Sequence, residues 1–330
     1  MKIIISINTS WNIYNFRSGL VTFLKKEGHE VIAVAPKDDY SQKLESELGC
    51  KFYPIDMDNK GSNPVKDIFL TFSYLKLFKK IKPDVILQYT IKPNIYGSIA
   101  ARLLSIPTIN NVSGLGTIFI NPNNITSKVA LMLYRFAFKF PKRVFFQNND
   151  DLELFIDFNL VKKEISDVLP GSGVDLEKFK YSKKEKKEKF IFLMISRILY
   201  DKGIVEFIDA AREIKSKYKN VEFQILGMHD ESKGSIPKVK FKKWQEEGIV
   251  NYLGVTDDVV SKIITADCVV LPSYREGTPK TLLESLAVGR PIVTTNAPGC
   301  KETVINGENG YLCEIKNSKS LESQLIKIIN

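Results

Sequence analysis

The sequence predicts an α/β protein that contains two doubly wound parallel sheets. Short apolar runs bounded by turn residues alternate with helical segments along most of the chain. The segment PGSG at 170–173 interrupts this alternation and has the composition of a hinge. A chain of 330 residues is long enough for two ordinary domains. We therefore expect one domain over 1–169 and a second over 170–330.

The first half of the chain predicts a set of parallel strands joined by helices. The apolar runs that we interpret as strands are 2–7, 29–35, 84–88, 108–112, 144–147 and 167–169. The segments between them that have helical character are 13–26, 94–104, 127–140 and a helix from about 149. Doubly wound sheets bind ligands at the carboxyl ends of their strands. The loops 8–11, 89–93 and 113–117 are therefore the informative ones.

These three loops supply the candidate ligand-binding residues of the first domain. Ser10 lies in the first loop and Lys92, which is placed to hold a phosphate or simply to be solvated, lies in the second. Gly114 and Gly116 let backbone amides approach a ligand, because glycine has no side chain in the way. Glycines also mark ordinary turns, so both interpretations stay open here.

The second domain repeats the alternation of strands and helices. Its predicted strands are 190–195, 221–227, 250–254, 268–271 and a turn and strand over 307–311, with a helix over 318–329. Arg197 follows the first of these strands, and Lys202 precedes the next helix. Two cations at the carboxyl end of one strand can neutralise a diphosphate, Arg197 as a fork and Lys202 as a point charge.

The stretch DCVVLPSYREGTPKTLLESLAVGRP at 267–291 carries the strongest functional signal. Thr278 is predicted as the N-cap of a helix, Pro279 fits the first helical position, and Gly289 marks the end. The amides of Lys280, Thr281 and Leu282 are then expected to lie free at a partly positive helix end. Such an end binds anions, and a phosphate fits there.

Two carboxylates flank this predicted anion site. The loop delivers Glu276 to the mouth of the helix, and Glu284 lies one turn further in on the face of Lys280 and Thr281. Each carboxylate can accept two hydroxyl hydrogen bonds, which suits a sugar and a ribose on either side of a diphosphate. The structural alternative is an amphipathic helix in which Glu284 is solvated.

Motifs along nearly the whole chain resemble those of retaining family-4 glycosyltransferases of the glycosyltransferase B fold. Glu276 and Glu284 form the E-x7-E motif of that family. The segments that carry the rest of the resemblance are REGTPKTLLESLAVGRPIVTT, GENGYL, PGSGVDLEKF, TIKPNIYGSIAARLLSIP and INNVSGLG. The resemblance implies two Rossmann-like domains that face each other across a cleft.

The resemblance also implies roles for individual residues. Arg197 and Lys202 would bind the donor diphosphate, Glu276 the sugar hydroxyls and Glu284 the ribose, while the backbone near Tyr252 would meet the base. The remaining donor-binding positions are Gly277, Thr278, Pro279, Lys280, Thr281 and Leu282. Gly114 and Gly116 would face the sugar phosphate and the acceptor. Many relatives carry a histidine after the third strand, whereas Thr90, Ile91 and Lys92 stand in that region here.

The implied reaction transfers a sugar from a nucleotide donor with retention of configuration and without a metal cofactor. The TIKPN and SGLG loops resemble those of bacterial enzymes that build surface polysaccharides or lipid-linked oligosaccharides. We therefore expect a UDP-linked hexose or N-acetylhexosamine as donor and a glycan or polyprenyl-diphosphate-linked acceptor. Relatives usually continue for some tens of residues beyond the end of this chain, so truncation is one expectation.

The bulk composition indicates a globular protein with an anionic partner. The chain is 44% hydrophobic and 26% charged, carries a net charge of +10, and contains no apolar run as long as a membrane span requires. No nucleic-acid-binding motif is found, so a diphosphate-linked acceptor or an anionic membrane surface explains the charge at least as well. The basic amphipathic segment 127–140 predicts docking on the inner membrane face, or else it covers a core.

The cysteines and the absence of a signal peptide indicate a cytoplasmic protein with reduced thiols. The four cysteines have no paired spacing, and two histidines are too few for a zinc pattern. Asp56 and Asp58 form a D-x-D pair, a manganese-binding arrangement in other glycosyltransferases, which we interpret as a solvated loop. Activity that depends strictly on manganese would favour the metal interpretation instead.

Two other functions are compatible with this architecture. One is a sugar-nucleotide 2-epimerase, which needs acid and base residues that two histidines supply only thinly. The other is a non-catalytic protein that binds sugar nucleotides. A nicotinamide dehydrogenase is disfavoured because no G-x-G-x-x-G motif follows the first strand.

Overall fold

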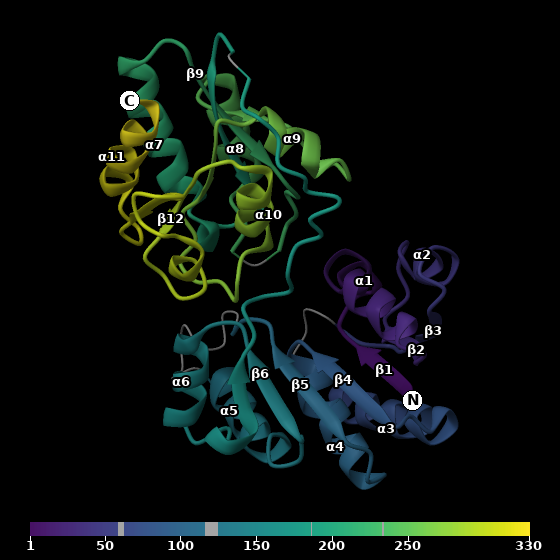
Figure 1. Ribbon diagram of the computed structural model, residues 1–330. Coiled ribbons are helices and arrows are strands. Elements are labelled where there is room, and N and C mark those ends of the chain that lie inside the picture. The colour runs from purple at the N-terminus through teal and green to yellow at the C-terminus, as the bar shows by residue number, and fades with distance from the viewer. Residues whose placement is uncertain (59–62, 116–124, 186, 233) are drawn as a thin grey trace. The chain divides into compact units, whose positions relative to one another are not determined.

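The computed structural model describes residues 1–58, 63–115, 125–185, 187–232 and 234–330 of the chain. The backbone divides into two compact units, Met1–Ser172 and Gly173–Asn330. The division falls inside the predicted hinge at 170–173. Each unit is an α/β domain built on one parallel sheet, as Figure 1 shows, and this confirms the predicted fold class.

The first unit contains a seven-stranded parallel sheet in the order β3-β2-β1-β4-β5-β6-β7. Its strands are β1 Lys2–Ser6, β2 Glu30–Ala35, β3 Lys51–Pro54, β4 Val85–Tyr89, β5 Thr108–Val112, β6 Arg143–Phe146 and β7 Ser166–Val168. The chain builds outward from β1 to β3 and then returns to start β4 on the other side of β1. The strand order therefore reverses between β1 and β4, where the crevice of a doubly wound sheet binds ligands.

Helices cover both faces of this sheet. They are α1 Ser10–Lys26, α2 Ser41–Ser46, α3 Pro64–Ile81, the π-helix η1 Pro93–Gly97, α4 Ser98–Leu103, α5 Ile125–Ala137, α6 Asn149–Asp157 and the short 3-10 helix η3 Lys163–Ile165. α1 packs on one face through Ile13 and Val21, while α3 packs on the other through residues such as Tyr74 and Phe78. Asn63 caps α3 by accepting from the Val65 and Lys66 amides.

The second unit contains a six-stranded parallel sheet in the order β10-β9-β8-β11-β12-β13. Its strands are β8 Phe190–Ile195, β9 Val221–Leu226, β10 Asn251–Tyr252, β11 Cys268–Leu271, β12 Ile292–Thr295 and β13 Gly310–Cys313. All four residues of β11 and all four of β12 are buried, which is typical of central strands covered on both faces. Here the strand order reverses between β8 and β11.

The helices of the second unit pack around this sheet and share one apolar core. They are η4 Tyr200–Lys202, α7 Ile204–Lys217, α8 Lys238–Glu246, α9 Val259–Thr265, α10 Lys280–Val288, η5 Lys301–Thr303 and α11 Ser318–Ile329. The C-terminal helix α11 lies beside α7 (Figure 1) and buries Leu321 and Leu325.

Several local predictions differ from the structure: the strands β3 and β12 were not predicted, and the strand expected over 307–311 is β13 at Gly310–Cys313. The segment 94–104 was predicted as one helix but begins as the π-helix η1, and 250–254 forms a strand only over Asn251–Tyr252. The 18-residue helix α3 was not predicted at all. It is apolar on its outward face as well as its inward face, so the amphipathic period that identifies a helix in a sequence is weak there.

Candidate functional site

The candidate donor site lies at the carboxyl edge of the second sheet, where its strand order reverses. Arg197 and Lys202 follow β8, and the loop that contains Glu276 follows β11, the neighbouring strand. A reversal of strand order leaves a crevice between the two loops that depart from it. Lys202 and Glu276 are 74 residues apart in the sequence, and the topology brings them together.

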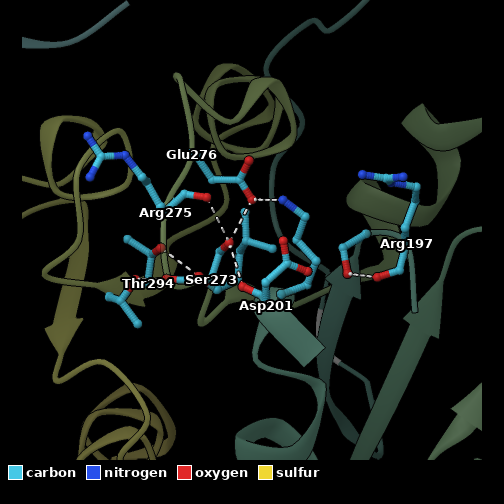
Figure 2. Close-up of polar contacts among 10 residues, drawn as sticks. Arg197, Asp201, Ser273, Arg275, Glu276 and Thr294 are labelled. Carbon is cyan, nitrogen blue, oxygen red and sulfur yellow. Dashed lines mark hydrogen bonds and ion pairs between the residues drawn. The ribbon is translucent and has the colours of Figure 1, made fainter. Parts of the chain in front are cut away.

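An ion pair joins the two sides of this edge. The Lys202 Nζ lies 2.5 Å from Oε1 of Glu276, and both side chains are largely shielded from solvent. The Ser273 hydroxyl donates to the same carboxylate oxygen at 2.7 Å and is itself fully buried. Figure 2 shows these contacts converging on the Glu276 carboxylate. The carboxylate is therefore held in one orientation before any ligand binds.

Backbone contacts fix the loop that carries Glu276. The Glu276 amide donates to the Pro298 carbonyl at 3.0 Å, and the Tyr274 amide donates to the Asp201 carbonyl at 2.9 Å. Gly299 has a φ of +82°, and a Cβ at that position would lie 2.2 Å from the Glu276 carbonyl oxygen. Only glycine permits this close approach. The loop after β12 thus contacts the backbone of Glu276 and holds it in place.

The helix after this loop begins one residue later than the sequence predicts. Pro279 is extended, with a ψ of 109°, so it is the N-cap residue and α10 starts at Lys280; no side chain caps it. The Leu282 amide donates to the Pro279 carbonyl at 3.1 Å, so the prediction that this amide is free is wrong. A tight first turn uses the third amide internally. The Thr281 amide has no acceptor in the described part of the chain.

Glu284 is buried rather than solvated. Its carboxylate lies on α10 with Oε1 3.4 Å from the Lys280 Nζ, and the residue is only 7% exposed. Burial raises the pKa of the Glu284 carboxyl above its usual value, and the nearby Lys280 ammonium only partly offsets this. A buried acid whose charge is only partly compensated can accept further hydrogen bonds from ligand hydroxyls.

The other predicted donor-binding residues lie at the same edge. Arg197 is exposed, and Figure 2 draws no interaction between its guanidinium and the Glu276 carboxylate. The Tyr252 hydroxyl donates to the Gly227 carbonyl at 2.8 Å and so orders the loop after β9. Gly277 is buried at the site, and Thr278 lies half-buried beside it.

The structure brings the first-domain candidates to the carboxyl edge of the first sheet but gives two of them internal partners. The Ser10 side chain is buried, and its hydroxyl bonds to Asp38 and to Ser41. Lys92 pairs with Asp67 at 2.5 Å and is largely buried, so it is not the solvated lysine of one interpretation. Gly114 has a φ of +127°, which favours glycine, and Gly116 lies outside the described residues.

The D-x-D pair has an ordinary structural environment. Asp58 lies 4.0 Å from the Lys66 Nζ, and Asp56 is exposed in the loop after β3. Within the described ranges, no three His, Cys, Asp or Glu side chains are grouped so that they could hold a metal ion.

Sequence reasoning missed Ser273 and Gly299 as parts of this site. Ser273 immediately precedes the tyrosine of the loop, and a lone serine in a loop is typical of any turn. The P-G pair at 298–299 signals a turn, but its contact with Glu276 depends on strand order. A sequence gives no direct information about which loops meet.

Two parallel-sheet units of this topology match the glycosyltransferase B fold. Residues 175–330 match the family described as Glycosyl transferases group 1, and residues 2–148 match Glycosyl transferase 4-like. The chain belongs to the glycosyltransferases, and its resemblance to family 4 is confirmed.

Curated relatives are similar over most of the chain. The N,N'-diacetylbacillosaminyl-diphospho-undecaprenol alpha-1,3-N-acetylgalactosaminyltransferase of Campylobacter jejuni is 33% identical, and the match covers 95% of this chain and 85% of that protein. The UDP-Gal:alpha-D-GlcNAc-diphosphoundecaprenol alpha-1,3-galactosyltransferase of Escherichia coli is 30% identical, and the match covers 80% of this chain and 71% of that protein. Among solved structures, Anabaena HepE in complex with UDP and glucose aligns over 100% of this chain and 90% of its own, with 19% identity and a TM-score of 0.77.

Proposed function

We propose that this protein transfers a hexose or N-acetylhexosamine from a UDP-linked donor to a lipid-linked acceptor, with retention of configuration. The observation that carries the proposal is the Lys202–Glu276–Ser273 cluster beside the start of α10. It combines a cation, a fixed carboxylate and a helix N-terminus at one switch point. That combination suits a diphosphate joined to a sugar.

The mechanism rests on stabilising the diphosphate that leaves the sugar. Negative charge grows on this diphosphate as the glycosidic bond breaks, so preorganised cations lower the barrier most. Arg197, Lys202 and the Thr281 amide supply positive charge without a metal ion. Glu276 orients the donor sugar through its hydroxyls, and Glu284 accepts from the ribose. We assign no protein nucleophile, and the leaving phosphate accepts the acceptor's proton.

The acceptor is proposed from the relatives. Two curated relatives at 30% identity or more are named for acceptors in which a sugar is joined to undecaprenol through a diphosphate. A polyprenyl-diphosphate-linked sugar accounts for the net charge of +10 through its diphosphate and places the reaction at a membrane surface. The transfer would then belong to the biosynthesis of a bacterial surface polysaccharide or lipid-linked oligosaccharide.

The first unit has surfaces suited to peripheral association with that membrane. No helix in the described part of the chain is long and apolar enough to span a bilayer. α3 exposes Val65, Ile68, Phe69 and Phe72, each by more than half, at the i, i+3, i+4, i+7 spacing of one helix face. Its Lys76, Lys79 and Lys80 continue this face and are also exposed. Its acid, Asp67, is buried against Lys92.

The predicted basic helix α5 is a second candidate for contact with the membrane. α5 packs against η1, as α3 does, and exposes Val129, Met132 and Phe136 beside Lys128 and Arg135. Its outer apolar side chains therefore do not cover a core. Apolar groups flanked by lysine and arginine suit an interface with anionic lipid headgroups.

Product analysis tests the proposed reaction. The purified protein is incubated with UDP-hexoses and UDP-N-acetylhexosamines, with and without a short polyprenyl-diphosphate-linked sugar, and products are identified by mass spectrometry and NMR. We expect acceptor-dependent transfer that yields an axial linkage from an axial donor. A change in the donor sugar without acceptor would identify an isomerase, and no turnover with bound UDP would identify a binding protein. Either result would overturn the proposal.

A further inference from the structure

Arg17 occupies a position where the helix pattern requires an apolar side chain. The buried residues of α1 are Ser10, Ile13, Arg17 and Val21, which lie along one face of the helix. This face packs on the sheet of the first unit together with Ile5 and Ile7. Arg17 is only 6% exposed, so its guanidinium lies within the packed face rather than above it.

Within the described residues, no carboxylate pairs with the buried guanidinium. It stacks on the ring of Tyr89, 4.4 Å from the centroid, and its Nη1 donates to the Phe16 carbonyl at 2.9 Å. The Nε is buried and has no acceptor, and none of the carboxylates in the described ranges pairs with this arginine. Burial lowers the pKa of the Arg17 guanidinium. An unpaired buried cation destabilises a fold, so its presence requires a compensating role.

The location of Arg17 indicates what that role is. Tyr89 is the last residue of β4, and β4 pairs with β1 at the point where the strand order reverses. Ser6 pairs with Gln88 in the parallel strands β1 and β4. Asn8 and Thr90, each two residues further on, therefore follow the two strands at equivalent positions. This is the position in the first unit that corresponds to the donor site in the second.

Two further features at this edge are typical of a ligand site. The Asn8 side-chain oxygen is buried without a hydrogen-bond partner in the described structure. Thr90 has a φ of +64°, a backbone conformation that is rare and energetically costly for a β-branched residue. Such strained residues cluster at functional sites. Lys92, the cation that the sequence offered for a phosphate, is neutralised by Asp67. Arg17 is thus the cation at this edge whose charge remains uncompensated in the described residues.

We propose that Arg17 binds the diphosphate of the polyprenyl-diphosphate acceptor. A guanidinium presents several N–H donors in a fixed fork that matches phosphate oxygens, and a low-polarity surrounding strengthens that contact. The bound anion supplies the charge that the folded protein lacks. This inference rests on the proposed function, and it assigns the acceptor's anion to the first unit.

Binding of farnesyl diphosphate, measured by calorimetry with the donor site saturated by UDP, tests the proposal. We expect Arg17→Met to weaken this binding at least about tenfold. The same variant should bind farnesol as the wild type does and should melt at an equal or higher temperature, because an apolar side chain replaces an uncompensated buried charge. A packing role for Arg17 predicts the opposite, namely a lower melting temperature with unchanged affinity for farnesyl diphosphate.

Matched variants keep the outcome unambiguous. Arg102→Met is the control, because Arg102 also lies over an aromatic ring, that of Phe140 at 5.7 Å, and belongs to the same unit; its binding should not change. If Arg17→Met melts lower, Arg17→Lys is compared with it at a temperature where both are folded. If Arg17→Lys binds farnesyl diphosphate and Arg17→Met does not, the proposal is supported. If both variants lose the same affinity, the proposal is overturned.

Two other results overturn the assignment. If Arg17→Met binds farnesyl diphosphate with the affinity of the wild type, Arg17 does not contact the diphosphate. Inorganic diphosphate that binds as tightly as farnesyl diphosphate assigns the site to a free anion instead of the acceptor. Absence of sugar transfer by the wild type is a separate result, which tests the proposed reaction and leaves this binding measurement valid.

Discussion

At the scale of single residues, Glu276 and Glu284 meet opposite environments within one site. Glu276 has a lysine partner and a serine hydroxyl donor, so its carboxylate is compensated and oriented. Glu284 is more deeply buried, and burial outweighs Lys280 in setting its pKa. The environment of Glu276 suits a group that positions a reacting sugar. The environment of Glu284 suits a carboxylate that accepts hydrogen bonds from ligand hydroxyls.

Replacing each acid should separate binding from turnover. Glu284→Ala should weaken UDP binding by about 1.5–3 kcal/mol, the usual loss for a hydrogen bond to a charged group. Glu276→Ala should leave UDP binding nearly unchanged and lower kcat, because its partner is the sugar. Titration calorimetry and steady-state kinetics measure the two effects. Unchanged UDP affinity in Glu284→Ala would refute the ribose assignment.

The burial of Glu284 also predicts a pH dependence of stability. The pKa of this carboxyl is higher in the folded protein than in the unfolded chain, so its contribution to stability is full at low pH and is lost as pH rises through the folded pKa. Glu284→Gln does not ionise. Its stability relative to wild type should therefore be greater at about pH 7 than at about pH 4. Urea unfolding at both pH values measures this, and a constant difference would contradict it.

At the scale of elements, the loop after β12 decides where the loop after β11 lies. Gly299→Ala places a methyl group 2.2 Å from the Glu276 carbonyl and 2.3 Å from that of Gly277. The loop must shift, so we expect sugar transfer to fall at least tenfold, about 1.4 kcal/mol. Gly307→Ala is the control, since Gly307 has a similar φ of +88° and open space around it. Equal activity of the two variants would contradict a positioning role for Gly299.

The outer face of α3 predicts how the protein meets a membrane. Replacing Phe69 and Phe72 with serine removes two side chains that are 66% and 62% exposed. We expect the affinity for anionic liposomes, measured by sedimentation, to fall by at least about two orders of magnitude, because burying each aromatic group contributes about 1.5–3 kcal/mol. Phe23→Ser, on α1 of the same unit, is the control, since Phe23 is 58% exposed. Equal sedimentation of all variants would exclude α3 as the contact surface.

At the scale of the whole molecule, the proposed chemistry uses side chains and backbone amides in place of a metal ion. Activity should persist in excess EDTA, and added manganese should change kcat by less than about twofold, because Arg197, Lys202 and α10 neutralise the diphosphate. Turnover assays with EDTA and with manganese measure this. Strict dependence on manganese would contradict this prediction and favour metal binding by Asp56 and Asp58.

The sequence predicted most of the architecture because strands and turns leave local signals. The strands 108–112, 190–195 and 268–271 and the helix 318–329 were predicted with the bounds that the structure shows. α3 was missed because its outward residues are apolar, and no local rule distinguishes an apolar surface from a core. Arg17 was missed because an arginine on a helix is typical of a solvated face.

The sequence by itself determined the α/β class, the family and the candidate residues of the donor site, since these follow from alternation and from motifs of contiguous residues. The tertiary structure alone decided which cations remain available. In the first unit it paired Lys92 with Asp67, and within the described residues it left Arg17 buried without an acid partner. The physical reason is that strand order sets which side chains meet at a sheet edge, and strand order depends on contacts between residues far apart in the chain.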